Sequence, residues 1–382
     1  MLEQVLARYN IVDANYVNDD DMKSGQNKVL EPRYLLGSLM LSIGVLGFYL
    51  GGLWNWLGTV AFIFVVLFDI ALARDEVERD VKSTGFQNAV LYLQLPFIVV
   101  LWLMFAQMLH VGQSTVFEIA GAIFSISFLS ALGGLPPAHE LMHRRDKFAR
   151  FYSSLYLTVF MLPMNDLGHV RGHHLKVATS EDSDTPRRGE LVYTFAFRSL
   201  WGQFVDSVEM ERDRLSRHKR PLWATSGRFF QSFVTVGLWL TAWFFVAGIQ
   251  AIPVFILTII IFFLVLGGFN YTQHYGLIRI IDEPIELRHS WNQLKPLSRA
   301  LSFEISNHSE HHLVPTRAYT ELKPYPDAPQ MPSIALSFVA AFFPPIWERY
   351  FARPRLKLWD EHYASDAERA LANEANKAAG WI

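Results

Sequence analysis

Long stretches without a charged side chain constrain this sequence more than any other feature. No Asp, Glu, Lys or Arg occurs within 34–68, 83–117, 119–139 or 229–278. A helix needs about 20 predominantly apolar residues to cross the hydrocarbon core of a bilayer. We therefore predict an all-α integral membrane protein with six transmembrane helices. We place them at 34–52, 54–73, 90–110, 117–137, 230–248 and 251–268.

The basic residues predict how these helices are oriented. Four Lys/Arg lie in 1–33, three in 74–89, fifteen in 138–228 and twelve in 274–382, and the short connections near 53, 111–116 and 249–250 contain none. Basic loops remain on the cytoplasmic side of a membrane. We expect a multi-pass protein of the bacterial inner membrane with both termini in the cytoplasm. The N-terminus lacks the pattern of a cleaved signal peptide, so we expect none to be removed.

The predicted organisation alternates cytoplasmic and membrane segments. Residues 1–33, 138–229 and 269–382 are expected to be cytoplasmic, and 34–137 and 230–268 to contain four and two transmembrane helices. We expect the two larger cytoplasmic segments to fold together as one helical cap. The apolar runs 151–164 and 334–347 are too short to span. The tail 365–381 is rich in Ala and charged residues, and we expect an exposed helix there.

The absence of cysteine excludes several redox centres. The 382 residues contain no Cys, so the chain has no disulfide, thiolate zinc site or iron–sulfur cluster of its own. No G-x-G-x-x-G motif follows a predicted strand, so no flavin or nicotinamide domain is visible. A redox enzyme of this kind would receive its electrons from another protein.

Nine of the thirteen histidines fall in four groups at the predicted cytoplasmic side. The groups are "HELMH" (His139, His143), "HVRGHH" (His169, His173, His174), "NYTQHYGLIR" (His274) and "NHSEHH" (His308, His311, His312). Spacings of three to five residues bring histidines to one face of a helix, so each set can direct its ring nitrogens at one point. We expect the four groups to meet at one depth.

These histidine groups are compatible with more than one kind of site. A single i, i+4 histidine pair is often surface decoration, and "HELMH" alone matches the zinc protease motif H-E-x-x-H. A zinc site would leave the other histidines unexplained. Imidazole ligands without thiolate suit zinc, copper, iron or nickel, and nine ligands exceed the coordination shell of one metal and fit two. Two irons at a membrane, supplied with external electrons, would indicate activation of O2 against a lipid-soluble substrate.

The motifs resemble those of a known family. "HELMH", "HVRGHH" and "NHSEHH" resemble the three histidine boxes of membrane-bound di-iron hydroxylases and desaturases, and "NYTQHYGLIR" resembles the extra histidine motif of the alkane hydroxylase and xylene monooxygenase family. Within that family, "HELMHRR", "DSDTPRRGE", "DAPQMPS" and "ERALANEANKAAGW" are most similar to the xylene-type hydroxylase subunits.

The resemblance implies an O2-dependent non-heme di-iron monooxygenase. Such an enzyme inserts one oxygen atom into a methyl group, releases the other as water, and needs two irons but no flavin, haem or iron–sulfur cluster in its own chain. The implied iron ligands are His139, His143, His169, His173, His174, His274, His308, His311 and His312. The implied electron donor is a reductase with flavin and [2Fe–2S] for a xylene-type enzyme, or a rubredoxin with its reductase for an alkane-type enzyme.

Carboxylates near the boxes are candidates for holding the ligand histidines, since such histidines usually donate their second N–H to an acceptor. The candidates are Glu140, Asp166, Glu304 and Glu310. We interpret "EDSDTP", with Glu181, Asp182 and Asp184, as a loop charge pattern. We interpret His110, His218, His289 and His362 as ordinary interface or surface residues, and Trp54 and Trp56 as interfacial belt residues. Arg144, Arg145, Arg187 and Arg188 are candidates for steering an acidic redox partner.

The substrate and three rival functions remain open. The hydrocarbon is expected to enter from the bilayer, and is most simply an alkyl aromatic such as toluene or xylene; an n-alkane is the alternative. A fatty acyl desaturase would share the boxes, although the motif around His274 disfavours it. A zinc protease would not need oxygen. A metal transporter would place histidines along a path inside the spans, whereas these lie at or beyond the predicted ends. No nucleic-acid partner is expected.

Overall fold

The computed structural model describes residues 31–79 and 85–382, so most of the predicted segment 1–33 lies outside the described residues. The described chain contains helices and no named strand, with one isolated bridge between Asn292 and Gln330. Six helical stretches are long and apolar enough to cross a membrane: Pro32–Leu50, Gly52–Ala71, Gly85–Val111, Val116–His143, Arg228–Ala247 and Ile249–His274. The predicted fold class, an all-α protein with six transmembrane helices, is confirmed.

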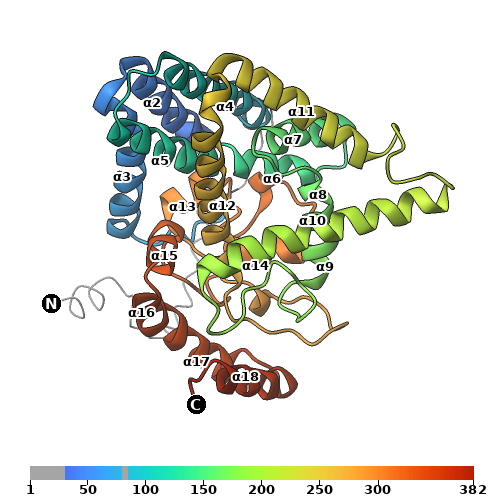
Figure 1. Cartoon of the computed structure of the whole chain (residues 1–382). Coiled ribbons are helices and arrows are strands. Elements are labelled where there is room, and N and C mark those ends of the chain that lie inside the picture. Colours follow the sequence, from blue (N-terminus) through green and yellow to red (C-terminus); the bar gives the residue numbers. More distant parts are fainter. Residues whose placement is uncertain (1–30, 80–84) are drawn as a thin grey trace.

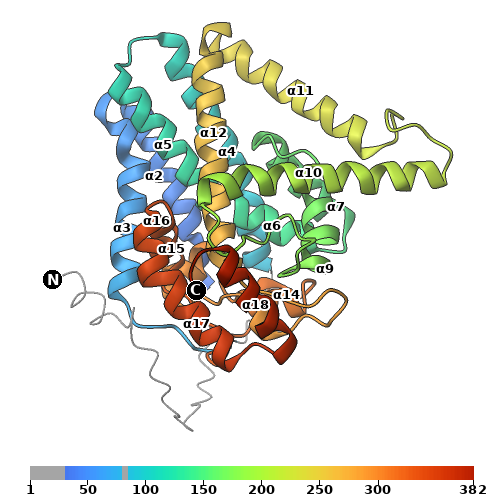
Figure 2. The same cartoon turned by 60° about the horizontal axis from the view of Figure 1, so that its bottom comes forward.

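The stretches pack into a bundle, from which Arg228–Ala247 (labelled α11) runs obliquely outward in Figures 1 and 2. They contain α2 (Leu36–Leu50), α3 (Leu57–Ala71), α4 (Gly85–Val111), α5 (Val116–Gly133), α6 (Leu135–His143), α11 (Arg228–Ala247) and α12 (Ile252–His274). Short links join them in three pairs, and Gly51, Gly112 and Gly248 in these links take positive φ values of 67°, 67° and 82° that glycine adopts without strain. Helix α2 packs against α4 and α5, and α12 packs against α5.

Two spans extend further toward the histidines than we predicted. Helix α12 continues to His274 rather than ending near residue 268, and the fourth span continues through a break at Gly134 into α6, which ends at His143. The last turns of α12 carry the polar residues Asn270, Thr272 and Gln273. They remain helical because protein packs around them, and Thr272 and Gln273 are buried.

The remaining helices form a cap on one end of the bundle. They are α7 (Lys147–Val159), α8 (Asn165–Gly168), the π-helical turn η3 (His169–His173), α9 (His174–Lys176), α10 (Val192–Arg217), α13 (Pro296–Leu301), α14 (His308–Leu313), α15 (Ile334–Ala341), α16 (Pro344–Ile346), the π-helical turn η7 (Trp347–Ala352), α17 (Arg353–His362) and α18 (Asp366–Ala378), with short 3₁₀ turns η1 (Glu31–Leu35), η5 (Leu287–His289) and η6 (Tyr319–Glu321). The 3₁₀ turns η2 (Gly52–Trp56) and η4 (Ile249–Ala251) belong instead to the short links between paired spans. Helix α10 lies across the bundle in Figure 2. Neither α7 nor α15 is long enough to span.

The two cap segments are joined by polar contacts to backbone. The Arg279 guanidinium donates from Nε to the Val177 carbonyl oxygen at 2.9 Å and from Nη2 to the Leu175 oxygen at 2.7 Å. Arg188 donates to the Gly276 oxygen and forms a bidentate pair with Asp360. Both guanidinium groups are buried, so they tie the loops around the second histidine box to the C-terminal part of the chain.

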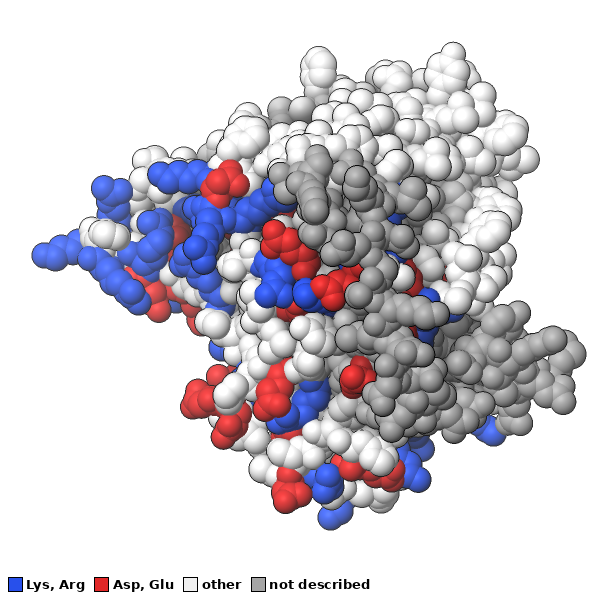
Figure 3. Space-filling view, turned by 180° about the vertical axis from the view of Figure 1, so that it is seen from behind, with Lys and Arg blue, Asp and Glu red and all other residues white. Residues whose placement is uncertain are grey.

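The surface separates into an uncharged part and a charged part. In Figure 3 the upper region is nearly free of blue and red, whereas Lys and Arg gather on the protrusion at the left and residues of both charges are scattered over the lower region. The protrusion is the end of α10 and the loop that follows it, where Arg212, Arg217, Lys219 and Arg220 are exposed. A broad uncharged belt over six apolar helices identifies a multi-pass membrane protein.

Candidate metal centre

The structure brings all nine histidines of the four motifs to one place between the bundle and the cap. His139 and His143 lie on α6, His274 is the last residue of α12, and the other six come from η3, α9 and α14 of the cap. Eight of the nine are buried and His139 is half-buried. Four short helical ends therefore supply a compact set of imidazoles.

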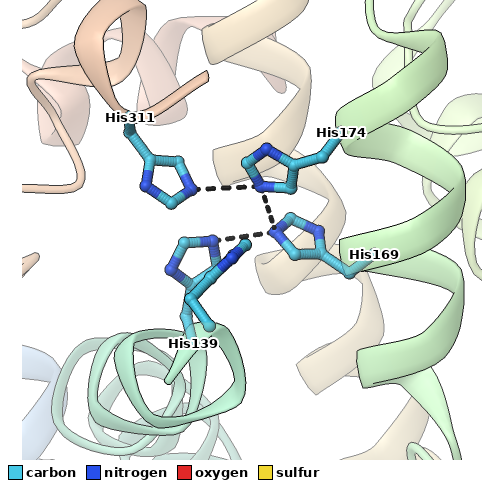
Figure 4. Close-up of side chains that lie close together, drawn as sticks. His139, His169, His174 and His311 are labelled. Carbon is cyan, nitrogen blue, oxygen red and sulfur yellow. Dashed lines mark hydrogen bonds between the residues drawn. The ribbon is translucent and has the colours of Figure 1, made fainter. Parts of the chain in front are cut away.

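Five of the histidines form one group, the five-histidine cluster: His139, His143, His169, His174 and His311. One ring nitrogen from each lies within 4.8 Å of the others. The Nε2 atom of His169 lies 2.8 Å from that of His139 and 3.2 Å from that of His174, and His311 Nε2 lies 3.1 Å from His174 Nε2. Figure 4 shows these rings converging with their nitrogens facing one another, His169 and His174 from one helical ribbon and His139 and His311 from two others.

The other four histidines, His173, His274, His308 and His312, form the four-histidine cluster. Nitrogens of His173, His274 and His312 lie within 4.8 Å of one another. His308 Nε2 lies 2.7 Å from His274 Nε2 and 3.2 Å from His312 Nε2. His173 and His174 are consecutive, so η3 and α9 join the two clusters.

The ring nitrogens in both clusters are better suited to bind metal cations than to form hydrogen bonds with one another. His308 Nδ1 donates to the Ile305 carbonyl oxygen at 3.0 Å. The Nε2 atom of His308 therefore carries a lone pair, which faces the cluster. Both ring nitrogens of His143 and Nδ1 of His139, His174, His274 and His312 are buried without a hydrogen-bond partner. Lone pairs that converge at the Nε2 atoms are costly when buried, and a cation bound between them satisfies one nitrogen of each ring.

Burial keeps most of these imidazoles neutral, as ligation requires. Desolvation, reinforced by neighbouring histidines, lowers the pKa of His169, His174, His311 and His312 well below the ordinary value. The pKa of His308 falls to about 3 for the same first reason. Neutral imidazole at physiological pH is the form that binds metal.

His173 differs because a carboxylate holds it. Its Nδ1 lies 2.8 Å from Asp182 Oδ2, and both side chains are 1% exposed. Burial opposes ionisation of each group, but their mutual attraction raises the pKa of His173 and lowers that of Asp182. This contact corrects our interpretation of "EDSDTP" as a loop charge pattern. No signal in the sequence marked Asp182, because the contact requires the loop to fold back on η3.

The four carboxylates that we predicted to hold ligand histidines pair with arginines. Glu140 binds Arg144 on its own helix, and Asp166 forms a bidentate pair with Arg228. Glu304 accepts from Arg299 at 2.6 Å and Glu310 contacts Arg317. No hydrogen bond joins any of the four to a histidine in the part of the chain that the structure describes. These carboxylates lie near the ligands in sequence, but each is paired with an arginine instead of a histidine.

Other candidates also have different surroundings from those expected. His289 is fully buried and lies 2.8 Å from Glu368 of α18, so neither it nor that helix is simply a surface feature. His110, His218 and His362 are exposed as predicted. Arg188 is buried in its pair with Asp360, which corrects its assignment to partner steering.

A largely apolar cavity opens onto both clusters. Its volume is about 120 Å³, and its wall includes His139 and His169 of one cluster and His173, His274 and His308 of the other. Apolar lining residues come from spans and cap, and include Val65, Leu132, Leu266, Leu157 and Leu200. An apolar molecule in this cavity would lie directly beside the metal centre.

Comparison with known proteins agrees with this architecture. The family model "Fatty acid desaturase" matches residues 113–342. The chain is 38% identical over 353 residues to the xylene/toluene monooxygenase hydroxylase component XylM of Pseudomonas putida, covering 91% of this chain and 95% of that protein. It is 30% identical to an alkane 1-monooxygenase of Alcanivorax borkumensis, covering 85% of each, and 28% identical to one of Pseudomonas putida, covering 75% and 72%.

Three independent features now agree. The family model includes all nine histidines, the match to XylM covers 91% of the chain, and the histidines form two clusters at one end of six membrane helices. The resemblance inferred from the histidine boxes is confirmed. The chain belongs to the membrane-bound histidine-box family of oxygen-dependent oxidoreductases, in the branch that contains the xylene and alkane monooxygenases.

Proposed function

We propose that this protein is the hydroxylase component of a di-iron monooxygenase that converts the methyl group of an alkyl aromatic, such as toluene or xylene, to an alcohol. The observation that carries the proposal is the apolar cavity bounded by both histidine clusters. Similarity to XylM over nearly the full length favours an aromatic substrate over an n-alkane.

In this proposal the five-histidine cluster holds one iron and the four-histidine cluster holds the second. The ligand assignments are His139, His143, His169, His174 and His311 for the first iron, and His173, His274, His308 and His312 for the second. Iron bound here supplies reductive activation of O2 and transfer of one oxygen atom into a C–H bond. Imidazole donors without thiolate suit iron, and the absence of cysteine leaves reducing equivalents to a separate protein.

The protein's own residues position the reaction and exclude water. Asp182 orients the ring of His173, and Ile305 orients that of His308. The apolar cavity wall removes water from the substrate methyl group. Spans α3, α5 and α12 contribute Val65, Ala131 and Leu266 to that wall, and the proposed route for the hydrocarbon is from the bilayer between these spans.

The proposed location is the bacterial inner membrane, with the cap, the metal centre and the C-terminus in the cytoplasm. Support comes from the basic residues gathered on the cap side. The electron donor is a soluble protein that docks there, either a reductase with flavin and [2Fe–2S] or a rubredoxin. Arg145 and Arg187 are exposed on that side and available to an acidic partner, whereas Arg144 is engaged by Glu140.

Product analysis tests the substrate directly. The chain is co-expressed with a flavin/[2Fe–2S] reductase and with a rubredoxin system, toluene and octane are fed together, and the alcohols are quantified by gas chromatography. We expect mainly benzyl alcohol, lost in His173→Ala and retained in the matched control His218→Ala, whose ring is exposed outside the centre. Mainly 1-octanol would overturn the aromatic assignment, and an unsaturated acyl product would indicate a desaturase.

A further inference from the structure

The cavity has a polar strip within its apolar wall. Asp184 from the loop after α9, Gln203 from α10 and Asn270 from α12 all line it. Asp184 and Gln203 are each 1% exposed to solvent. A hydrocarbon cannot form a hydrogen bond with any of these groups, so the strip serves no purpose in binding the hydrocarbon itself.

Hydrogen bonds orient every group in the strip. The Asp184 carboxylate accepts from the Ser199 hydroxyl and from Asn270 Nδ2, which lies 3.1 Å from Oδ2. Ser199 has one hydroxyl proton and gives it to Asp184.

This arrangement determines which way the Gln203 amide faces. Because the Ser199 oxygen has no further proton to offer, it can only accept, and Gln203 Nε2 donates to it at 3.1 Å. The amide nitrogen therefore faces Ser199, and Oε1 is the free end. Oε1 is buried and has no hydrogen-bond partner among the described residues.

We propose that Gln203 Oε1 is the acceptor for the hydroxyl group of an alcohol bound in this cavity. An unpaired buried acceptor is unfavourable, and a ligand with an apolar body and one O–H donor would satisfy it. The inference rests on the proposed function only in that hydroxylation would generate such an alcohol here. Gln203 thereby becomes a specificity residue that distinguishes an alcohol from the hydrocarbon of the same shape.

Binding without turnover tests the subsite. The metal-loaded enzyme is placed in nanodiscs without reductant or oxygen. Equilibrium binding of labelled benzyl alcohol, ethylbenzene and benzyl methyl ether is then measured and corrected with empty nanodiscs. Ethylbenzene replaces the hydroxyl with a methyl group, and the ether retains oxygen but has no donor. We expect Gln203→Met to lower the affinity for benzyl alcohol by about 5- to 10-fold, which corresponds to the loss of one hydrogen bond. The affinities for ethylbenzene and for the ether should stay the same or increase.

Gln293→Met is the matched control. Gln293 is also fully buried and has an unpartnered Oε1, but it does not line the cavity, so its replacement should not alter the preference among the three ligands. Equal weakening of all three ligands in Gln203→Met, or no weakening, would overturn the proposal; the latter would mean that bound water satisfies Oε1. If Gln203→Met does not fold, a wild-type enzyme that fails to prefer the alcohol over the ether overturns it as well.

The binding readout separates this inference from the proposed function. An enzyme that hydroxylates toluene but binds benzyl alcohol equally well with and without Gln203 retains its function and loses the subsite. An enzyme that does not hydroxylate toluene but loses alcohol affinity in Gln203→Met retains the subsite and loses the proposed substrate.

Discussion

His173 Nδ1 lies 2.8 Å from Asp182 Oδ2, nine residues further along the chain, and this contact joins the four-histidine cluster to the loop before α10. The same carboxylate oxygen accepts from the Thr185 hydroxyl at 2.6 Å, and Oδ1 accepts from the Asp184 amide at 3.0 Å. These hydrogen bonds fix the position of the Asp182 carboxylate. The carboxylate in turn fixes the orientation of the His173 ring, because it binds the Nδ1 atom of that ring.

Replacing Asp182 should weaken the metal site without removing a ligand. We expect Asp182→Asn to lower iron affinity by about 10- to 100-fold, because a carboxylate partner orients the ring and raises its basicity. Iron retained after dialysis against graded chelator, measured by mass spectrometry, checks this. Asp213→Asn on the exposed side of α10 is the control. Unchanged iron retention in Asp182→Asn would show that the contact contributes nothing to metal binding.

The two clusters should respond differently to loss of one histidine. His312→Ala leaves three histidines in its cluster, whereas His143→Ala leaves four in the other. We expect His312→Ala to lose about one of two bound irons and His143→Ala to retain more metal, since fewer remaining donors hold a cation less tightly. Iron per chain in the purified variants is the measurement. Identical losses would contradict the division into clusters of five and four.

Gly168 sets the distance between the second histidine box and α10. A Cβ at this position would lie 2.5 Å from the Gln203 carbonyl oxygen and 2.8 Å from Ser207 Oγ. Backbone cannot move aside as a flexible side chain can, so we expect Gly168→Ala to destabilise the protein by about 1–3 kcal/mol, as overpacking does, and to reduce bound iron. Thermal unfolding and iron content measure the two effects.

Gly237 provides the comparison for Gly168. It also lies within a helix, α11, but a Cβ there would meet nothing within 4 Å. Gly237→Ala should therefore leave the unfolding temperature unchanged or raise it slightly, since Ala favours helix over Gly. A loss of stability equal to that of Gly168→Ala would mean that close approach to α10 is not the cause.

The docking of α18 should weaken in acid. Burial alone would raise the pKa of Glu368, but hydrogen bonds from His289, Arg288 and the Ser365 amide lower it to about 2. The folded state therefore favours the carboxylate, and this stabilisation is present above pH 4.5 and is lost as the pH falls toward 2. The unfolding temperature of wild type should exceed that of Glu368→Gln at pH 7, with the difference shrinking below pH 4.5.

Comparing the unfolding temperatures of wild type and Glu368→Gln at the same pH removes the general effect of acid on the metal centre, because both proteins experience it. Glu374→Gln, an exposed position on the same helix, should match wild type at every pH. A difference between wild type and Glu368→Gln that grows on acidification would contradict the assigned direction of the pKa shift.

Much of the fold could be predicted because bilayer and helix geometry act locally. Absence of charge over about 20 residues identifies a span wherever it occurs, and the i, i+4 spacing of His139 and His143 places both on one face of any helix. The span ends were less predictable. Near His274 and His143, polar residues that suggest the end of a span are enclosed by the cap, so the helices continue.

The sequence by itself therefore determined the six apolar helices, the four histidine groups and their common end of the bundle. Only the tertiary structure decided which histidines share a cluster, that Asp182 rather than Glu140 holds a ring, that Arg188 and His289 bind Asp360 and Glu368, and that Gln203 faces the cavity. The reason is physical. Periodicity constrains residues within a few turns of one another, whereas a contact such as His174 with His311, separated by 137 positions, depends on how whole helices pack.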